Sequence, residues 1–531
     1  MKLWQPKLAK RIKQVGRHHN LKEKLPPKDA FEKCGDLTTF TFSLEENISK
    51  LQEIFRNCTD VVFRRFVFDG LGKPVQCALI YINGIVETAA VNENILRPLM
   101  QRGTSSCYQQ PLPRFIREYS LPVGDIYSAF YIEEFVSGIL KGSAGLLFDG
   151  YNEALLADVG GGEYRSVEEP AAEVTIRGPR DSFTENIKTN VSLIRRRVRN
   201  AHLRTEAFHL GKQTQLKAVL IYIDGIANPR VVEEVRQCLN TINMDGIVGS
   251  SHLIDLIVSE KRTPFPLINY TERPDRVVGQ LLEGRVAITV DGTPVMITLP
   301  VLFVEFLQSP EDYYENTIST SVLRVMRIIA LNMSLILPAL YVAIITFHQE
   351  MIPASLLISI AGSKEEIPFP TIIEALIMEF TFEILREAGI RLPRATGQAV
   401  SIVGALVIGE AAVQAGIVSQ TMVMVVALTG ICSFAIPQFS GGLVLRLLRF
   451  LLIILAGVLG LVGIVAGLLV ILIHIVSLKS FGVPYLAPIA PLVPRDLTDV
   501  YLRAPVWAKP TRPKFIGKQN PIRLSPEDLL K

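Results

Sequence analysis

ALIYINGIV at residues 78–86 returns as VLIYIDGIA at residues 219–227, and this recurrence decides how the N-terminal half is organised. A second pair, ILKGSAGLLFDG at residues 139–150 and LLEGRVAITVDG at residues 281–292, has nearly the same spacing. The first pair is offset by 141 positions (220 minus 79) and the second by 142 (281 minus 139). Because two separate segments keep one offset, the pattern predicts a duplicated α/β unit and not chance similarity between short apolar strands.

Each copy contains an Asp-Gly dipeptide between apolar runs, at Asp149-Gly150 and at Asp291-Gly292. A two-residue hairpin loop needs positive φ at both positions, and Asp-Gly is one of the pairs that supplies it. We therefore interpret both dipeptides as hairpin turns and not as paired catalytic carboxylates. The glycine run at residues 160–162 lacks the Lys-Ser/Thr and the strand-to-helix context of a phosphate-binding loop, so we interpret it as an ordinary loop.

Apolar residues are segregated toward the C-terminal half. Hydrophobic residues make up 49% of the 531 residues and charged residues 20%, and the mean hydropathy of +0.32 is high for a soluble protein. Up to residue 321 no apolar run reaches the roughly 20 residues that a membrane-crossing helix needs. Such runs follow at residues 328–347, 399–418, 422–437 and 450–476. We expect transmembrane helices there, because only an internally bonded backbone is stable in hydrocarbon.

The expected fold class is an α/β soluble N-terminal region of two similar subdomains, followed by an all-α multi-span membrane domain. The expected parts are a basic mobile tail (1–36), a first α/β subdomain (37–168), a connecting segment with a basic helix (169–215), a second α/β subdomain (216–320), a transmembrane domain (321–478) and a Pro-rich basic C-terminal tail (479–531). Anionic lipid headgroups attract basic tails of this kind. Membrane lipids are therefore expected partners, and a solvated tail without a lipid partner is the alternative.

The N-terminal sequence MKLWQPKLAKRIKQVG is basic but has no apolar core of signal-peptide length. We expect the soluble half to stay in the cytoplasm, where the six cysteines are kept reduced. The cysteines fall at no metal-binding spacing, so we predict no disulfide, no metal site and no cofactor. Because no nucleophile-base or nucleotide motif is found either, we do not expect an enzyme.

A basic helix is predicted around residues 190–205, and its arginines include Arg195, Arg196, Arg197 and Arg199. Arginines can grip nucleic acid, because phosphate contacts dominate such binding. No aromatic residues interleave with them here. We therefore predict a subunit or interdomain contact and no nucleic-acid partner.

Several long blocks of this sequence are similar to the GerA-family spore germination proteins. The blocks are EPAAEVTIRGPRDSFTENIKTNVSLIRRR (169–197), RTPFPLINYTERPDRVVGQLLEGRVAITVDGTP (262–294), LPALYVAIITFHQEMIP (337–353) and REAGIRLPRATGQAVSIVGALVIGEAAVQAGIVS (386–419). The resemblance covers about residues 169–437 in matching order.

The resemblance implies the A subunit of a nutrient-germinant receptor in the inner spore membrane, with its N-terminal region on the spore core side. It implies a permease-like B subunit and a lipoprotein C subunit as partners. It also implies that the receptor senses amino acids or sugars and triggers cation release, and that the A subunit assembles as a homo-oligomer into an ion-conducting channel.

Four acidic residues are candidates for the ion pathway. Glu410 lies inside an apolar run, where an ionisable side chain costs about 2.5 kcal/mol or more and normally faces a bundle interior or water. A place near one membrane face is the alternative. Glu379, Glu383 and Glu387 follow one another at i, i+4 spacing, so they line one helical face. In a symmetric oligomer that face forms acidic rings, which select cations; an interfacial helix with a solvated acidic face is the alternative.

Small and kinking residues are assigned structural roles in the apolar runs. Gly457, Gly460, Gly463 and Gly467 are predicted to let helices pack closely. Pro338 frees a backbone carbonyl, and it is either a gating hinge or a static bend. We expect four spans with both tails in the cytoplasm and a re-entrant or interfacial segment at residues 352–385; a single crossing by that segment, with the C-terminal tail outside, is the alternative.

The leading hypothesis is a receptor subunit that forms a ligand-gated cation channel. A secondary transporter is the first alternative, although transporters often repeat halves of their membrane domain and the duplication here lies in the soluble half. A membrane signalling scaffold without a pore is the second alternative.

Overall fold

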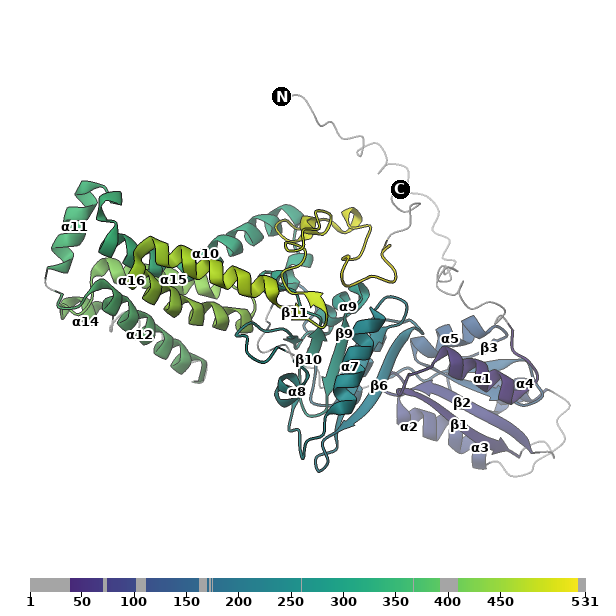
Figure 1. Ribbon diagram of the computed structural model, residues 1–531. Helices are drawn as coiled ribbons and strands as arrows, with labels where there is room; N and C mark the ends of the chain where they lie inside the picture. Colours follow the sequence, from purple (N-terminus) through teal and green to yellow (C-terminus); the bar gives the residue numbers. More distant parts are fainter. Residues whose placement is uncertain are drawn as a thin grey trace, which may run out of the picture.

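The computed structural model describes residues 39–69, 74–101, 111–161, 170, 173, 175–258, 260–365, 367–391 and 409–523. Three parts follow one another along the molecule (Figure 1). A first α/β unit (39–161) is followed by a second α/β unit (175–301), and then by a layer of helices (317–477) that we call the helical layer. A C-terminal segment (479–523) returns from the helical layer to the second unit. The expected N-terminal tail at residues 1–36 lies outside the described residues.

The first unit is a five-stranded antiparallel sheet in the order β1-β2-β4-β5-β3, with helices on both faces. Its elements are α1 (Leu44–Ile54), β1 (Val61–Phe68), β2 (Val75–Ile82), α2 (Thr88–Ala90), α3 (Arg97–Gln101), α4 (Leu112–Phe115), β3 (Ile126–Ala129), α5 (Ile132–Lys141), β4 (Ser143–Phe148) and β5 (Ala154–Asp158), with π-helical turns at Val91–Leu96 and Ile116–Ser120.

The second unit has the same strand order, β6-β7-β9-β10-β8. Its elements are α6 (Ile187–Arg197), β6 (Leu203–Leu210), β7 (Leu216–Ile223), α7 (Pro229–Thr241), α8 (Ser250–Ile257), β8 (Asn269–Thr271), α9 (Pro274–Glu283), β9 (Val286–Val290) and β10 (Met296–Leu299). Each repeated sequence segment therefore occupies an equivalent place: β2 matches β7, and β4 matches β9. Because helices cover both faces of each sheet, these central strands are continuous apolar runs without polar alternation.

The Asp-Gly dipeptides do lie between hairpin strands, but the two-residue loop we predicted is wrong. Five residues separate β4 from β5, and of the dipeptide only the glycine has positive φ, 84° at Gly150. The aspartate instead caps a helix: Asp149 Oδ1 accepts a hydrogen bond from Leu44 N at the start of α1 (3.1 Å). Asp291 Oδ1 accepts the equivalent bond from Ile187 N at the start of α6 (3.3 Å). These carboxylates are structural.

A third repeated segment, which the sequence comparison missed, begins each unit. In the first unit Asn47 Oδ1 accepts from Thr41 N (2.9 Å), and in the second unit Asn190 Oδ1 accepts from Thr184 N (2.7 Å). The second unit thus begins before α6 and includes β6. The segment at residues 169–215, which we expected to be a connector, contributes the first helix and the first strand of this unit.

The helical layer contains α10 (Thr317–Phe347), α11 (Ala354–Lys364), α12 (Thr371–Arg391), α14 (Gly409–Gln414), α15 (Gln420–Phe434) and α16 (Phe439–Ser477). Only α10 and α16 among the described helices are long and apolar enough to cross a membrane, by length and composition. The expected run at residues 422–437 corresponds to α15, which has 15 residues. Residues 399–408 of another expected run lie outside the described residues. Of the four expected spans, only those at residues 328–347 and 450–476 coincide with a described helix that is long and apolar enough to cross a membrane, namely α10 and α16.

The long helix α16 is a hairpin of two arms, whereas we expected one transmembrane helix at residues 450–476. Its backbone is non-helical at Gly460 (φ 63°, ψ −142°). A Cβ atom at Gly467 would lie 2.6 Å from Leu452 Cδ2, although 15 residues along one straight helix span about 22 Å. The two arms therefore run side by side, from Phe439 to Leu459 and from Leu461 to Ser477.

The C-terminal segment, which we expected to be a Pro-rich basic tail, packs against the second unit over its described part. It contains β11 (Lys479–Ser480), β12 (Val483–Pro484) and short 3₁₀ turns at Asp496–Asp499 and Val506–Ala508. Tyr485 is fully buried, and its backbone N–H hydrogen-bonds to Leu478 while its carbonyl accepts from Phe303 N (2.9 Å). Arg512 Nε donates to Leu282 O (2.8 Å) at the end of α9.

Candidate functional site

Buried charges join three helices of the helical layer. Arg449 Nη1 on the first arm of α16 lies 2.6 Å from Glu379 Oε2 on α12, and both side chains are only 2% exposed. Arg449 Nε also donates to the carbonyl of Ser334 on α10 (2.7 Å). Pro338 lacks the N–H that would normally bond to this carbonyl, so the arginine satisfies an acceptor that the proline leaves free. We call Glu379, Arg449 and Ser334 the central tie.

A second set of charges extends this contact along α12. Arg446 Nη1 lies 2.6 Å from Glu383 Oε1, and Arg386 Nη1 lies 3.4 Å from Glu383 Oε2. Arg386 also donates to Ser433 Oγ on α15 (2.7 Å), and its guanidinium lies 4.8 Å from the ring centroid of Phe434. Contacts of this kind hold α12 against both α15 and α16.

The central tie is not fully hydrogen-bonded. Glu379 Oε1 and Arg449 Nη2 are buried and have no hydrogen-bond partner within the described part of the chain. A buried ion pair offsets its desolvation cost only when the remaining donors and acceptors are satisfied. The tie therefore holds the helices less tightly than a saturated pair would.

The three carboxylates that we placed on one helical stripe have different environments. Glu379 is buried and paired, Glu383 is half-buried and paired, and Glu387 is exposed and pairs with Arg391 on its own helix (2.6 Å). The i, i+4 spacing places them on α12 as expected, but two of the three charges are neutralised by α16. Their role in an ion pathway stays a prediction.

Glu410 is exposed on the surface of α14 and accepts a hydrogen bond from Gln414 Nε2 (3.2 Å). Residues 392–408, directly before α14, lie outside the described residues, and the expected place of Glu410 in a bundle interior or in water stays a prediction. Gly457 and Gly467 do lie at close helix contacts: a Cβ at Gly457 would lie 2.2 Å from Ile372 Cδ1 on α12. Gly463 packs against Leu455 of the opposite arm, and Gly460 forms the hairpin turn itself.

The basic helix α6 joins the two α/β units. Arg195 is fully buried and donates through Nε (2.7 Å) and Nη2 (3.0 Å) to Asp60, which precedes β1 in the first unit. Thr205 Oγ1 donates to the same carboxylate (2.6 Å). Burial raises the pKa of Asp60, but the Arg195 charge and these hydrogen bonds outweigh it and bring the pKa below its usual value.

The other arginines that we singled out have lesser roles in this joint. Arg196 Nη2 donates to Gly84 O of the first unit (3.3 Å), which is also an inter-unit contact. Arg197 pairs with Asp181 within the second unit (2.5 Å), and Arg199 Nε donates to the carbonyl of Arg196 (3.3 Å).

Arg446 and Arg449 are the residues that sequence reasoning missed. They stand in RLLRF at residues 446–450, directly before the apolar run that we expected to begin at residue 450. Two arginines at i, i+3 spacing directly before an apolar run could have predicted acidic partners on a neighbouring helix, because charges next to or inside such a run normally have partners. In the described part of the chain no group of three or more His, Cys, Asp or Glu side chains could hold a metal ion.

The chain belongs to the Bacillus/Clostridium GerA spore germination protein family, which matches residues 49–515. It is similar to spore germination protein KA of Bacillus subtilis, with 45% identity covering 91% of this chain and 88% of that protein. It is also similar to the uncharacterized membrane protein YfkQ of Bacillus subtilis, with 42% identity covering 90% and 92% of the two chains.

A solved structure also matches the chain. It is the N-terminal domain of the A subunit of the Bacillus megaterium spore germinant receptor GerK3, with 34% identity and a TM-score of 0.41. The match covers 50% of this chain and 98% of that domain.

Proposed function

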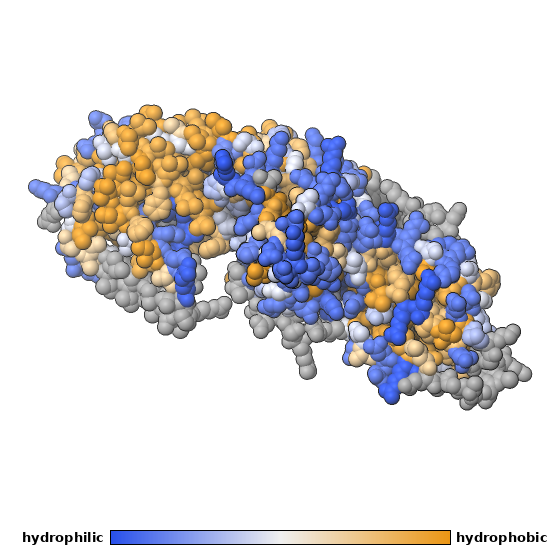
Figure 2. Space-filling model, turned by 60° about the horizontal axis from the view of Figure 1, so that its bottom comes forward, coloured by the Kyte–Doolittle hydropathy of each residue, from blue (hydrophilic) through white to orange (hydrophobic). Residues whose placement is uncertain are grey.

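We propose that this chain is a membrane subunit of a nutrient-germinant receptor in the inner spore membrane, and that it acts there without catalysing a reaction. The main support for the proposal is that the GerA family matches residues 49–515 of the chain. The chain also has two described helices that are long and apolar enough to cross a membrane. Figure 2 shows hydrophobic side chains gathered over the helical layer, whereas hydrophilic side chains dominate the surface of the second unit. A bilayer is the natural solvent for the helical layer.

The soluble parts would all lie on one side, which we propose is the spore core. Both ends of the α16 hairpin lie at the second unit: the side-chain amide of Gln438, directly before α16, lies 2.8 Å from Asn269 Oδ1 on β8, and His474 Nε2 lies 2.9 Å from Thr263 Oγ1. The first arm has 21 residues, about 31 Å at 1.5 Å per residue, which matches a hydrocarbon core of about 30 Å. The turn at Gly460 would then lie at the opposite face of the membrane.

The outer face of α12 supports a homo-oligomer. Phe380, Ile384 and Glu387 border an open groove of about 480 Å³ on this face. The groove carries carboxylate and guanidinium groups, which are costly against lipid tails. We propose that this face meets other copies of the chain around a shared water-filled path, in a complex with a permease-like B subunit and a lipoprotein C subunit.

The mechanism that we propose is a ligand-gated cation path in which α16 covers the acidic residues of α12. While Arg449 and Arg446 neutralise Glu379 and Glu383, little negative charge faces the path. Movement of the α16 hairpin away from α12 would expose these carboxylates, and acidic rings favour cations. The incomplete hydrogen bonding of the central tie lowers the cost of this movement.

A pore-less signalling scaffold is the second candidate, because Glu379 and Glu383 already have partners within one chain. Glu387→Lys separates the two functions, since this side chain is exposed and its replacement leaves the central tie intact. Glu350→Lys, on the 3₁₀ turn Gln349–Met351 outside α12, is the matched control. The measurement is germinant-triggered potassium release from spores, with protein levels checked by immunoblot.

We expect Glu387→Lys to block potassium release and Glu350→Lys to leave it unchanged. Normal release from a well-expressed Glu387→Lys variant would contradict the cation path and favour the scaffold. Normal germination of spores that lack the chain, on every nutrient that triggers the wild type, would contradict a receptor role altogether.

A further inference from the structure

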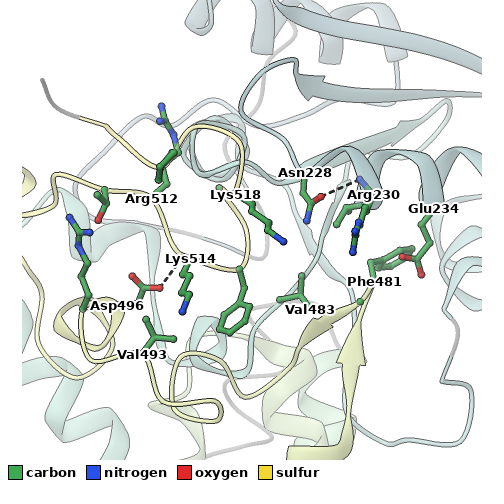
Figure 3. A pocket seen from close by; sticks show the side chains of 17 residues that line it. Asn228, Arg230, Glu234, Phe481, Val483, Val493, Asp496, Arg512, Lys514 and Lys518 are labelled. Atoms are coloured by element: carbon green, nitrogen blue, oxygen red, sulfur yellow. Dashed lines mark hydrogen bonds between the residues drawn. The ribbon is translucent and has the colours of Figure 1, made fainter.

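A cavity of about 600 Å³ lies between the N-terminal end of α7 and the C-terminal segment. In Figure 3, Arg230 and Glu234 of α7 lie on one side, and Lys514 and Lys518 of the C-terminal segment lie on the other. The volume is within the roughly 300–1,000 Å³ range of small-molecule sites. The family match ends at residue 515, and none of the residues that we proposed for the ion path lies in this cavity.

Positive charge is in excess around the cavity. Its lining includes five cationic side chains (Arg230, Arg495, Arg512, Lys514 and Lys518) and two carboxylates (Glu234 and Asp496). Arg512 donates to backbone carbonyls, and Asp496 Oδ2 accepts from the backbone N–H of Lys514 (2.9 Å). Among the described residues, the side chains of Arg230, Arg495, Lys514 and Lys518 have no ion-pair partner. Burial raises the pKa of Glu234 above its usual value.

The rest of the lining is apolar. Val231, Phe481, Val483, Val493 and Phe515 contribute to it. Phe481 is 7% exposed and stands in the turn between β11 and β12. A bare inorganic ion would leave this apolar surface unused, whereas an organic group attached to an anion would bury it.

We propose that this cavity binds an organic anion that carries a phosphate group. A phosphate monoester has a charge of about −1.5 to −2 at neutral pH and several strong acceptor oxygens, which suits an excess of three positive charges better than one carboxylate does. Lys514 and Lys518 bind the phosphate from the C-terminal segment, and Arg230 binds it from α7. The organic part lies against the valine and phenylalanine side chains.

The ligand would join α7 to the segment that directly follows the α16 hairpin. Phe481 is four residues beyond Ser477, so the cavity begins within about 14 Å of the end of α16. A bound anion therefore fixes the position of the hairpin end relative to the second unit. Two sources have the required chemistry: a soluble phosphate ester, or the headgroup of an anionic lipid.

The test uses the full-length chain in nanodiscs of phosphatidylcholine, with phenyl phosphate as the soluble probe and benzyl alcohol as its uncharged counterpart. Binding is measured by isothermal titration calorimetry. We expect phenyl phosphate to bind and benzyl alcohol not to bind. Lys514→Ala combined with Lys518→Ala should weaken binding about tenfold or more, because hydrogen bonds to charged groups are lost. Lys212→Ala, an exposed lysine on the β6–β7 loop that is absent from the cavity lining, should leave binding unchanged.

A second series in nanodiscs that also contain phosphatidylglycerol identifies the source. Unchanged phenyl phosphate binding supports a soluble ligand, and competition by phosphatidylglycerol that is lost in the double lysine variant supports a lipid headgroup. Absence of phenyl phosphate binding in phosphatidylcholine, or equal weakening by Lys212→Ala, overturns the proposal. Because binding is measured without germination, either result leaves the proposed receptor role to its own test.

Discussion

Two buried arginine–carboxylate pairs lie at two joints of this chain, and they are built differently. Between the α/β units, Arg195 meets Asp60 through two hydrogen bonds of 2.7 and 3.0 Å, and Thr205 occupies another acceptor position of the same carboxylate. In the helical layer, Arg449 meets Glu379 through one hydrogen bond of 2.6 Å, and one polar atom of each side chain has no partner within the described residues.

A buried ion pair can therefore serve either as a permanent joint or as a contact that breaks when helices move. A saturated pair resists separation, because every donor and acceptor would have to be satisfied again elsewhere. An incompletely bonded pair loses less when the helices move apart. We therefore expect the two α/β units to move as one body, and the helical layer to be the part that rearranges.

Removing one partner of the central tie should have the largest effect. Arg449→Leu leaves the Glu379 carboxylate buried without an ion partner and leaves the Ser334 carbonyl unbonded. We expect a loss of about 3–5 kcal/mol in the free energy of unfolding, measured by thermal unfolding of the full-length chain in detergent. The double variant Glu379→Leu with Arg449→Leu should recover the part of this loss that comes from the unpaired buried carboxylate, although the Ser334 carbonyl stays unbonded. An Arg449→Leu variant as stable as the wild type would show that the central tie does not stabilise the helical layer.

The joint between the two α/β units, formed by Arg195 and Asp60, should respond differently when one or both partners are replaced by leucine. Arg195→Leu should cost somewhat less than Arg449→Leu, because Asp60 keeps its hydrogen bond from Thr205 and is 8% exposed. The double variant Asp60→Leu with Arg195→Leu should remain destabilised by about 1–3 kcal/mol, since it leaves Thr205 unsatisfied. Arg199→Ala is the control and should stay within about 0.5 kcal/mol of the wild type. A recovered fraction equal to that of Glu379→Leu with Arg449→Leu would mean that the two joints are not different in kind.

The hairpin turn of α16 is the next test of the helical layer. Gly460→Ala forces a side chain into a backbone conformation at φ 63° and ψ −142° and brings its Cβ within 2.9 Å of His348 Cε1. We expect a cost of about 1–3 kcal/mol. Gly442→Ala has open space around its Cβ in the first arm and should be neutral or slightly stabilising. Equal behaviour of the two variants in thermal unfolding would argue against the turn.

The smallest effect that we predict is a pH dependence of the inter-unit joint. The pKa of Asp60 is lower in the folded chain than its ordinary value of 3.8. The joint therefore contributes its full stability above pH 3.8 and loses it as the pH falls through the lower, folded pKa. Limited proteolysis between the units on acidification should reveal this loss, and Asp60→Asn should remove the dependence at this site. Cleavage that rises equally in both proteins would assign the acid sensitivity to other carboxylates.

Much of the architecture followed from local patterns. The offset of 141 to 142 positions predicted two similar units, and the order of strands is the same in both sheets. Apolar runs predicted the position of α10, because hydropathy depends only on composition within a window. The sequence analysis misplaced the boundary before α6, although the segments around Asn47 and Asn190 are themselves similar (FTFSLEENIS at 40–49 and FTENIKTNVS at 183–192). The hydrogen bonds of the two asparagines to Thr41 and Thr184 show that these segments occupy equivalent places.

By itself, the sequence determined the family, the duplication and the separation of polar from apolar parts, because each can be recognised from the residue types within short stretches of the chain. The tertiary structure alone decided which charges meet. Glu379 and Arg449 are 70 residues apart, and they pair because the first arm of α16 packs against α12. It also decided that residues 479–523 pack on the second unit, since burial of a proline-rich basic segment depends on a surface built far away in the sequence.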